Sequence, residues 1–256
     1  MELASLGSGS KGNGTLIRAG DALVLVDCGF TVVDTQRRLA RLGVSAEQLT
    51  AVVVTHEHAD HVRGVAPLAR RFNLPVMSSA GTAAAVASGR HALDGCRLMC
   101  WQTGQWQVHA NLSILPVSVP HDAREPCQYV FAQGRKRAGV LTDLGSVNRA
   151  VLEAFDDCDA LLLECNHDVD LLVHGPYPPS LKRRVGGPLG HLSNAQAAAL
   201  LQRWNTDRIQ HLVLSHLSEQ NNTAALARDA VAGAVGEGER IRVACQQQGT
   251  GWLVIE

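Results

Sequence analysis

The chain has 256 residues, of which 46% are hydrophobic and 18% charged, and its formal net charge at pH 7 is −1. This is enough apolar material for one large α/β domain or two small ones. The near-neutral charge excludes a global positive field, so a polyanionic substrate would have to be held by local groups. No apolar run approaches the roughly 18 residues that span a bilayer, and the first residues do not resemble a secretory leader. We therefore expect a cytoplasmic protein without a membrane partner.

The first half of the chain is predicted to alternate strands with helices. Short apolar runs that end in turn residues predict strands at 3–6, 15–19, 22–26, 51–54 and 75–78. Amphipathic or alanine-rich segments predict helices at 31–42, 61–72 and 80–88. Between the first two strands lies a glycine-rich loop, residues 7–14. Its backbone N–H groups, together with Lys11, would either hold an anion or form a tight hairpin. The loop lacks the spacing of a P-loop, which argues against nucleotide binding.

The second half repeats this alternation without a linker or a low-complexity tract. Strands are predicted at 97–101, 105–108, 112–119, 128–132, 137–141, 160–163, 211–214, 240–244 and 252–255. Helices are predicted at 146–155, 181–185, 194–204 and 224–234. The seven cysteines contain no C-x-x-C pair, so we expect free thiols in a reducing compartment. The pattern favours a single α/β domain over residues 1–256, built of two packed sheets with helices outside.

The densest chemistry lies in residues 55–64, THEHADHVRG, directly after the apolar run 51–54. Histidine and aspartate at ligand spacing beyond a buried strand indicate a metal site, whereas a lone histidine there would indicate a solvated loop. Alternate residues of an extended loop point the same way. His56 and His58 can therefore close on one ion while Asp60 and His61 turn toward a second.

This loop resembles the T-H-x-H-x-D-H signature of the metallo-β-lactamase superfamily, whose fold is an αββα sandwich. Three further positions, each directly after a predicted strand, match the remaining ligands of that superfamily: His121, Asp143 and His216. The resemblance implies a first metal bound by His56, His58 and His121, a second bound by Asp60, His61 and His216, and a bridging Asp143. The implied cofactors are two divalent ions, Zn²⁺ or Mn²⁺ with iron as a further option, holding a hydroxide between them as nucleophile.

Four further strings resemble the YycJ/WalJ branch of the superfamily, which is described as bacterial phosphodiesterases with 5′-to-3′ exonuclease activity on DNA. They begin at Ser8 (SGSKGN), Glu164 (ECNHD), Gly190 (GHLSN) and Ser215 (SHLSEQNN). The resemblance implies that DNA or another phosphodiester is the substrate. Superfamily members that open lactam rings with zinc carry a cysteine where this chain has Asp143, so β-lactamase activity is disfavoured.

The expected catalytic residues are Asp60 and His191. His191 precedes a predicted helix, where it would bind substrate or act as general acid, or else support a ligand or cap the helix. The full set of expected substrate-binding residues is Ser8, Ser10, Lys11, Asn13, His167, His191 and Ser193. Asp27, at the end of the strand 22–26, would either orient a metal-binding histidine or stabilise a turn.

Two other functions stay open at this stage. On the same site, the substrate could be a small phosphodiester, as in PhnP-like relatives, or a thioester, as in glyoxalase II. A regulatory or scaffold protein that binds metal without turnover is a different class. The seven expected ligands argue against it, because a structural site is normally closed by four ligands around one ion. The sequence gives no indication of the oligomeric state.

Overall fold

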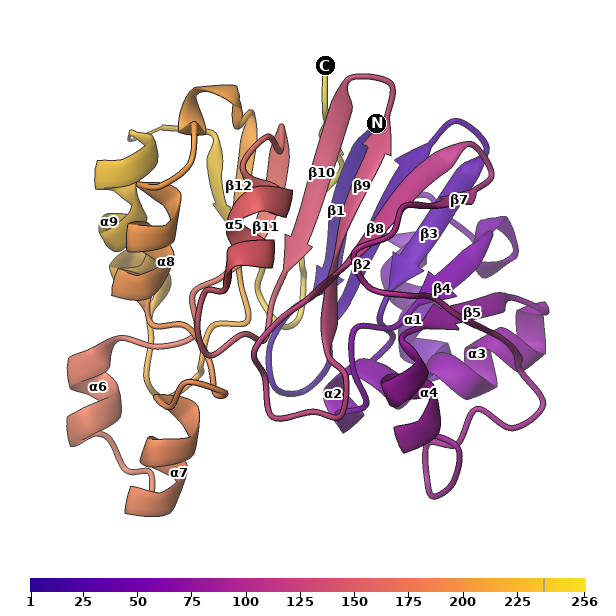
Figure 1. Ribbon diagram of the computed structural model, residues 1–256, viewed down its shortest axis with the longest axis horizontal. Coiled ribbons are helices and arrows are strands. Elements are labelled where there is room, and N and C mark those ends of the chain that lie inside the picture. Colours follow the sequence, from indigo (N-terminus) through magenta and orange to yellow (C-terminus); the bar gives the residue numbers. More distant parts are fainter. Residues whose placement is uncertain (237) are drawn as a thin grey trace.

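The computed structural model describes residues 1–236 and 238–256 and has the expected αββα architecture (Figure 1). Among these residues, each of two sheets contains seven strands, and the sheets face one another between outer layers of helices. Buried side chains from both sheets fill the space between them, including Met77, Tyr129 and Phe131. The expected fold class is therefore confirmed.

The first sheet has the strand order β14-β1-β2-β3-β4-β5-β6. The strands are β1 (Glu2–Gly7), β2 (Gly14–Ala19), β3 (Ala22–Val26), β4 (Ala51–Val53), β5 (Pro75–Ser78), β6 (Arg97–Cys100) and β14 (Leu253–Val254). Strands β3 to β6 are parallel, and β1 runs the same way because β2 is antiparallel to both of its neighbours. The segments that follow β1, β3 and β4 therefore leave the sheet at one edge.

The second sheet has the order β13-β12-β11-β10-β9-β8-β7. The strands are β7 (Gln107–His109), β8 (Leu112–Ser118), β9 (Cys127–Gln133), β10 (Lys136–Leu141), β11 (Ala160–Glu164), β12 (His211–Ser215) and β13 (Ile241–Val243). Strands β10 to β13 are parallel, and β8 runs with them because β9 is antiparallel to both β8 and β10. The carboxyl ends of β8, β10, β11 and β12 thus lie at one edge of the sheet.

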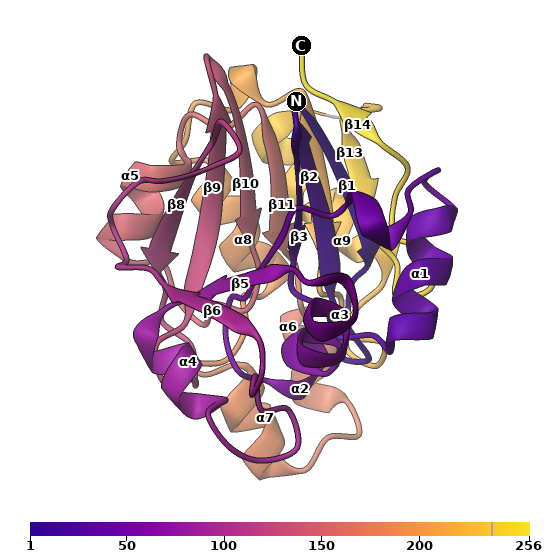
Figure 2. The same ribbon diagram turned by 90° about the vertical axis from the view of Figure 1, so that its right-hand side faces the viewer.

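Helices cover the outer faces of the sheets. The helices that alternate with the strands of the first sheet are α1 (Val32–Ala40), α2 (Ala59–Val62), α3 (Val65–Phe72) and α4 (Ala80–Ala85). Those that alternate with the strands of the second sheet are α5 (Arg149–Phe155), α8 (Asn194–Leu201) and α9 (Ala224–Val235). Short 3₁₀ turns lie at Ala46–Gln48 and Thr206–Arg208. Figures 1 and 2 show α6 (Val169–His174) and α7 (Pro179–Val185) projecting beyond the carboxyl edge of the sheets. Nowhere in the described ranges is a helix both long and apolar enough to cross a membrane.

Several predicted boundaries are wrong for local reasons. The helix expected at 61–72 is two helices that meet at Gly64. The N–H of Gly64 donates to the Cys28 carbonyl (2.7 Å), and a Cβ there would collide with the Phe30 carbonyl oxygen. The helix expected from residue 146 begins only after Asn148, whose side chain caps it through the Val151 N–H (2.9 Å). Helix α6 was not predicted at all. All seven cysteines are free thiols, as expected.

Candidate metal centre

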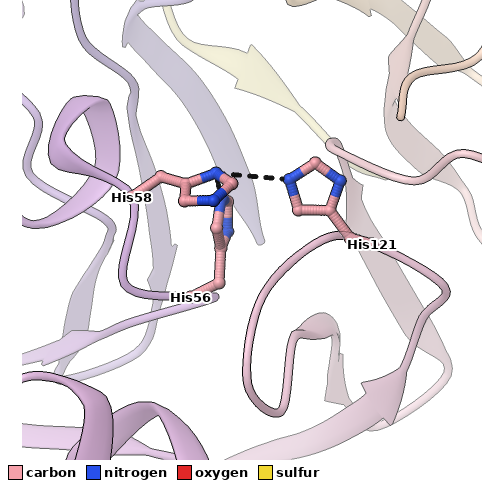
Figure 3. A group of neighbouring side chains, drawn as sticks. All are labelled: His56, His58 and His121. Atoms are coloured by element: carbon pink, nitrogen blue, oxygen red, sulfur yellow. Dashed lines mark hydrogen bonds between the residues drawn. The ribbon is translucent and has the colours of Figure 1, made fainter. Parts of the chain in front are cut away.

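All seven predicted metal ligands converge where the carboxyl edges of the two sheets meet. The first group is His56, His58 and His121, whose rings point toward one another (Figure 3). His58 Nδ1 lies 3.1 Å from His56 Nε2 and 3.4 Å from His121 Nε2. His56 and His58 come from the loop between β4 and α2, and His121 follows β8. Three imidazole nitrogens this close together form the kind of tripod that binds one transition-metal ion.

The second group is Asp60, His61 and His216. Asp60 Oδ2 lies 3.6 Å from both His61 Nε2 and His216 Nε2. Asp143 lies between the two groups, because its Oδ2 is 3.3 Å from His61 Nε2 and its carboxylate also clusters with His56. A carboxylate in this position can bind cations on both sides. The structure thus brings the expected ligands together in two groups with Asp143 between them, and their binding of metal stays a prediction.

Two atoms of this cluster show that a cation fits here. Asp143 Oδ2 and His216 Nε2 are buried, and within the described part of the chain neither has a hydrogen-bond partner. Buried polar atoms are nearly always paired, so an orphaned pair at the centre of a ligand cluster needs an explanation. Coordination of a divalent metal ion would satisfy both atoms. The donor set, which mixes imidazole nitrogen with carboxylate oxygen, suits such ions.

The ring nitrogens that face away from the centre are held by the surrounding protein. His61 Nδ1 lies 2.8 Å from Asp27 Oδ2, and His121 Nδ1 lies 3.0 Å from the Gly190 carbonyl oxygen. Asp27 also accepts hydrogen bonds from the backbone N–H and the hydroxyl of Thr55, both at 2.8 Å. Such partners fix the tautomer and the orientation of a ligating imidazole. Of the two roles considered for Asp27, the geometry therefore supports the orienting one.

Three of the strand ends that carry these groups have a left-handed backbone. The φ angles are +59° at Asp27, +52° at Asp143 and +54° at His216, after β3, β10 and β12 respectively. This region costs a non-glycine residue on the order of 1–3 kcal/mol and is retained where the surroundings over-determine it. Sharp turns at these three strand ends direct the side chains of Asp27, Asp143 and His216 toward the ligand cluster. Among the described residues, the other non-glycine positions with such a φ are Asn73, Ala110 and Asn111, which lie in turns away from the metal centre.

The electrostatics of the cluster favour positive charge between the carboxylates. Burial alone would raise the pKa of Asp143, but His216 and His61 outweigh burial and hold it well below its usual range. Burial opposes protonation of His216, yet Asp143 and its neighbours raise the pKa of that ring to about 10. Burial, aided by His61, lowers the pKa of His56 well below normal, which keeps this ring neutral. The carboxylates stay ionised, and a proton or a metal ion is attracted among them.

Two expected substrate-binding residues instead support the ligands. The N–H of His216 donates to Ser8 Oγ (2.9 Å), and the Ser8 hydroxyl donates to Asn13 Oδ1 (3.1 Å). Asn13 Nδ2 lies 3.1 Å from His61 Nε2 and 3.4 Å from Asp60 Oδ2. Both side chains are buried. Ser8 and Asn13 therefore hold the second ligand group in position through these hydrogen bonds.

The glycine-rich loop does not form the open anion cradle that its composition suggested. The N–H groups of Gly9, Gly12 and Asn13 donate to Asn13 Oδ1, Gly9 O and Asp60 O, and that of Lys11 to Gln246 Oε1. The Lys11 ammonium pairs with Glu219 at 2.7 Å. These donors are already used within the protein. Ser10, by contrast, is exposed and lines the cavity above the metal centre.

The remaining expected substrate residues divide between two cavities. His191 lines the cavity above the metal centre, about 320 Å³ in volume, together with His58, Asp60 and Asp143. His167 and Ser193 line a different one, beside Lys182 and Arg183 of α7. Ser193 caps α8 by accepting from the Gln196 N–H at 3.2 Å. Thus His191 is at the metal centre, and His167 and Ser193 lie behind it.

Glu164 is a functional candidate that the sequence analysis did not assign. It is fully buried at the end of β11, and its Oε1 lies 2.8 Å from His191 Nδ1 and 3.1 Å from His216 Nδ1. Its other oxygen accepts from the N–H groups of Leu144 (3.1 Å) and Leu192 (3.0 Å). Burial alone would raise its pKa, but His191 and the other donors lower it to about 2. Its position after a buried parallel strand, like that of Asp27, was the available signal.

Comparison with known proteins agrees with this site. The family model described as the beta-lactamase superfamily domain matches residues 23–217. Exodeoxyribonuclease YycJ of Bacillus anthracis is 31% identical over 231 residues, which are 90% of this chain and 88% of that protein. Exodeoxyribonuclease WalJ of Streptococcus pneumoniae is 33% identical over 224 residues, 87% of this chain and 83% of the relative.

The fold is shared with solved structures at lower identity. The metallo-β-lactamase fold protein YhfI from Bacillus subtilis has a TM-score of 0.73 over 98% of each chain, at 20% identity. Fold, ligand cluster and relatives together define a metal-dependent hydrolase. The chain belongs to the metallo-β-lactamase superfamily, and the resemblance noted in its motifs is confirmed.

Proposed function

We propose that this protein is a cytoplasmic metal-dependent phosphodiesterase that degrades DNA from its 5′ end. The observation that carries the proposal is the convergence of seven nitrogen and oxygen donors, with Asp143 between two groups, at the base of an open cavity. The similarity to two exodeoxyribonucleases over most of the chain supports DNA as the substrate. A carboxylate at position 143 favours phosphoryl chemistry, because it suits oxygen-preferring ions.

In this proposal the cluster holds two divalent cations. His56, His58 and His121 would bind one, and Asp60, His61 and His216 the other, with Asp143 between them. Zn²⁺ and Mn²⁺ both suit this set, and iron is a third option. When bound, such ions polarise a phosphoryl oxygen and make water a better nucleophile near neutral pH. Asp60 also lines the cavity, where its carboxylate would accept a hydrogen bond from the attacking water and orient it.

His191 is the residue best placed to supply a proton to the leaving oxygen. Glu164 holds its Nδ1 at 2.8 Å, which leaves Nε2 as the ring atom that can serve the cavity. Burial opposes protonation of His191, but the Glu164 carboxylate outweighs this and raises its pKa. The ring is about one-fifth exposed, so a substrate can reach it. Of the roles considered for His191, general acid agrees best with this geometry.

The charges near the cavity are consistent with a polyanionic substrate. Helix α7 carries Lys182, Arg183 and Arg184 in its last turn, and Arg184 lies on the wall of the metal cavity. Arg184 Nε is 2.6 Å from Asp122 Oδ2, and Asp122 lines the same cavity. A chain of net charge −1 needs such a local cationic cluster to hold a nucleic-acid backbone. We propose that DNA passes along α7.

The test is a nuclease assay of protein loaded separately with Mn²⁺ and Zn²⁺. DNA labelled at its 5′ or 3′ end should release labelled mononucleotides at once only from the 5′ end. RNA, bis(p-nitrophenyl) phosphate and S-lactoylglutathione are assayed in parallel. His58→Ala protein, purified identically, controls for contaminating nucleases. Intact DNA alongside rapid cleavage of the small diester or the thioester would contradict the proposal and favour the small-molecule alternative.

A further inference from the structure

A second, smaller cavity adjoins the one above the metal centre. Its volume is about 140 Å³, and it shares Ser10, His191 and His216 with the larger cavity. Complete small-molecule sites usually begin at roughly 300 Å³, so this cavity suits one group of a larger ligand. Because the two cavities meet at His191 and His216, a ligand bound at the metal centre can extend a neighbouring group into the smaller one.

The walls of the two cavities differ in chemistry. The larger one is lined by charged groups, including Asp60, Asp122 and Arg184. The smaller one lacks these charged side chains, and the residues that line it alone are Tyr177, Leu217, Asn166 and Ser218. A phosphate belongs among the charged groups and the metal ligands. A flat, largely apolar ring with polar edges belongs in the smaller cavity.

The backbone at Tyr177 is restricted before any ligand arrives. Tyr177 stands between Pro176 and Pro178, and proline fixes its own φ and restricts the residue before it. The side chain is half-buried, which leaves part of it accessible. An aromatic side chain on a restricted backbone loses less conformational freedom on binding than a flexible one does.

Tyr177 lies in sequence register with two residues of α7 that line the same cavity. Tyr177 precedes α7, and Leu181 and Val185 follow at intervals of four residues. All three line the smaller cavity, and Leu181 and Val185 line the larger one as well. The other tyrosine of the chain, Tyr129, is in the core, where its hydroxyl donates to the Val54 carbonyl. Tyr177 is thus the tyrosine that a substrate can reach.

We propose that Tyr177 stacks on the nucleobase attached to the phosphate at the metal centre, and that it is a specificity-determining residue for nucleotides. The inference rests on the proposed phosphodiesterase activity. Stacking on an aromatic ring is available to every base, so this contact would distinguish nucleotides from base-free diesters without selecting a sequence. A single stacking position also agrees with an aromatic content of only 4%.

The test compares two diesters with the same leaving group, p-nitrophenyl thymidine 5′-phosphate and methyl p-nitrophenyl phosphate. In the parent enzyme, kcat/KM should be roughly 5- to 100-fold higher for the thymidine ester, the range expected for one base stack. Tyr177→Phe should keep this ratio. Tyr177→Leu, which retains apolar bulk, should bring it close to one, mainly through KM. Trp106→Leu, at an exposed aromatic residue that lines neither cavity, is the matched control and should keep the ratio.

A second arm removes the nitrophenyl ring from the comparison. Oligonucleotides with an abasic residue at the first or second 5′ position should be degraded more slowly by the parent, and Tyr177→Leu should abolish that difference. An active Tyr177→Leu enzyme with unchanged ratios would overturn the inference and leave the proposed function standing. If no phosphodiester is cleaved at all, the proposed function fails. Titration with thymidine 5′-monophosphate then decides the inference, which equal affinities of parent and Tyr177→Leu would overturn.

Discussion

The two sheets contribute to the metal centre in different ways. The first sheet supplies four of the proposed ligands from one short segment after β4: His56 and His58 in the loop, and Asp60 and His61 in the helix α2 that follows it. The second sheet supplies three, from the ends of strands that are far apart in the sequence: His121, Asp143 and His216. The segment after β4 is a local pattern that a sequence displays directly. The second set is brought together only because β8, β10 and β12 run in the same direction.

The ligands of the two sheets also differ in burial, with His58 as the most exposed. The His58 side chain is 29% exposed, whereas His56 and His61 of the same set are fully buried and the side chains of His121, Asp143 and His216 are 1%, 2% and 5% exposed. Removing an exposed ligand leaves no cavity in the core, but removing a buried one leaves a void and unpaired charges. A substitution at His58 should therefore separate catalysis from stability more cleanly than one at the strand ends.

His58→Ala should have the largest effect on activity of the changes considered. Loss of one ligand from the first group removes several kcal/mol of metal-based stabilisation, so kcat/KM on a diester should fall at least about 10³-fold. The unfolding temperature should change little, because the side chain is partly exposed. His91→Ala, outside the cluster, is the control. Loss of cooperative unfolding in His58→Ala would show that the metal is structural. It would also contradict the expected separation of catalysis from stability at His58.

Glu164→Gln tests the carboxylate that holds His191 and His216 at the end of the second sheet. Glutamine keeps the size of the side chain but not its charge. Its NH₂ group cannot accept a hydrogen bond, so it would face one of the donors that Glu164 now binds. We expect kcat to fall about 10²-fold with little change in KM, because Glu164 acts on substrate through His191. Urea unfolding should show a loss of about 1–3 kcal/mol. Glu153→Gln, at an exposed residue of α5, is the control. A fully active Glu164→Gln enzyme would remove Glu164 from the site.

Asp27→Asn tests the corresponding support in the first sheet. The asparagine oxygen can still accept from Thr55, but the uncharged side chain no longer favours the proton on His61 Nδ1. We expect metal affinity to fall about 10- to 100-fold, as measured by competition with a chelating dye. Asp229→Asn, on the exposed face of α9, should leave it unchanged. An unaltered affinity in Asp27→Asn would mean that Asp27 serves the turn alone.

The smallest effect is expected at the outer rim of the site. DNA with a 5′-phosphate should be degraded roughly tenfold to a hundredfold faster than DNA with a 5′-hydroxyl, as one charge-assisted contact allows. Ser10→Ala should reduce this ratio several-fold, because Ser10 is exposed and lines the cavity above the metal centre. Ser193→Ala should cost about 1 kcal/mol of stability through the lost helix cap. Equal rates on both kinds of end would exclude a terminal-phosphate pocket.

What the sequence could predict follows from the same comparison. The ligands were predictable because each lies in a motif or directly after an apolar strand, as Asp143 does. The role of Asp27 stayed open because it depends on the pairing of β3 with β4. The role of the glycine-rich loop stayed open because two of its N–H groups donate to acceptors far along the chain, Asp60 O and Gln246 Oε1. Helix α6 was missed because its apolar residues Leu171 and Val173 are exposed, so no periodic face marks it.

The number of metal ions bound per chain tests the central claim most directly, since the claim is that both sheets build one two-metal site. Elemental analysis of protein loaded with Zn²⁺ or Mn²⁺ and freed of excess metal should give two equivalents per chain in the parent. Asp143→Ala, which removes the group between the two ligand sets, should bind fewer. One equivalent in the parent, with the same occupancy in Asp143→Ala, would contradict the account.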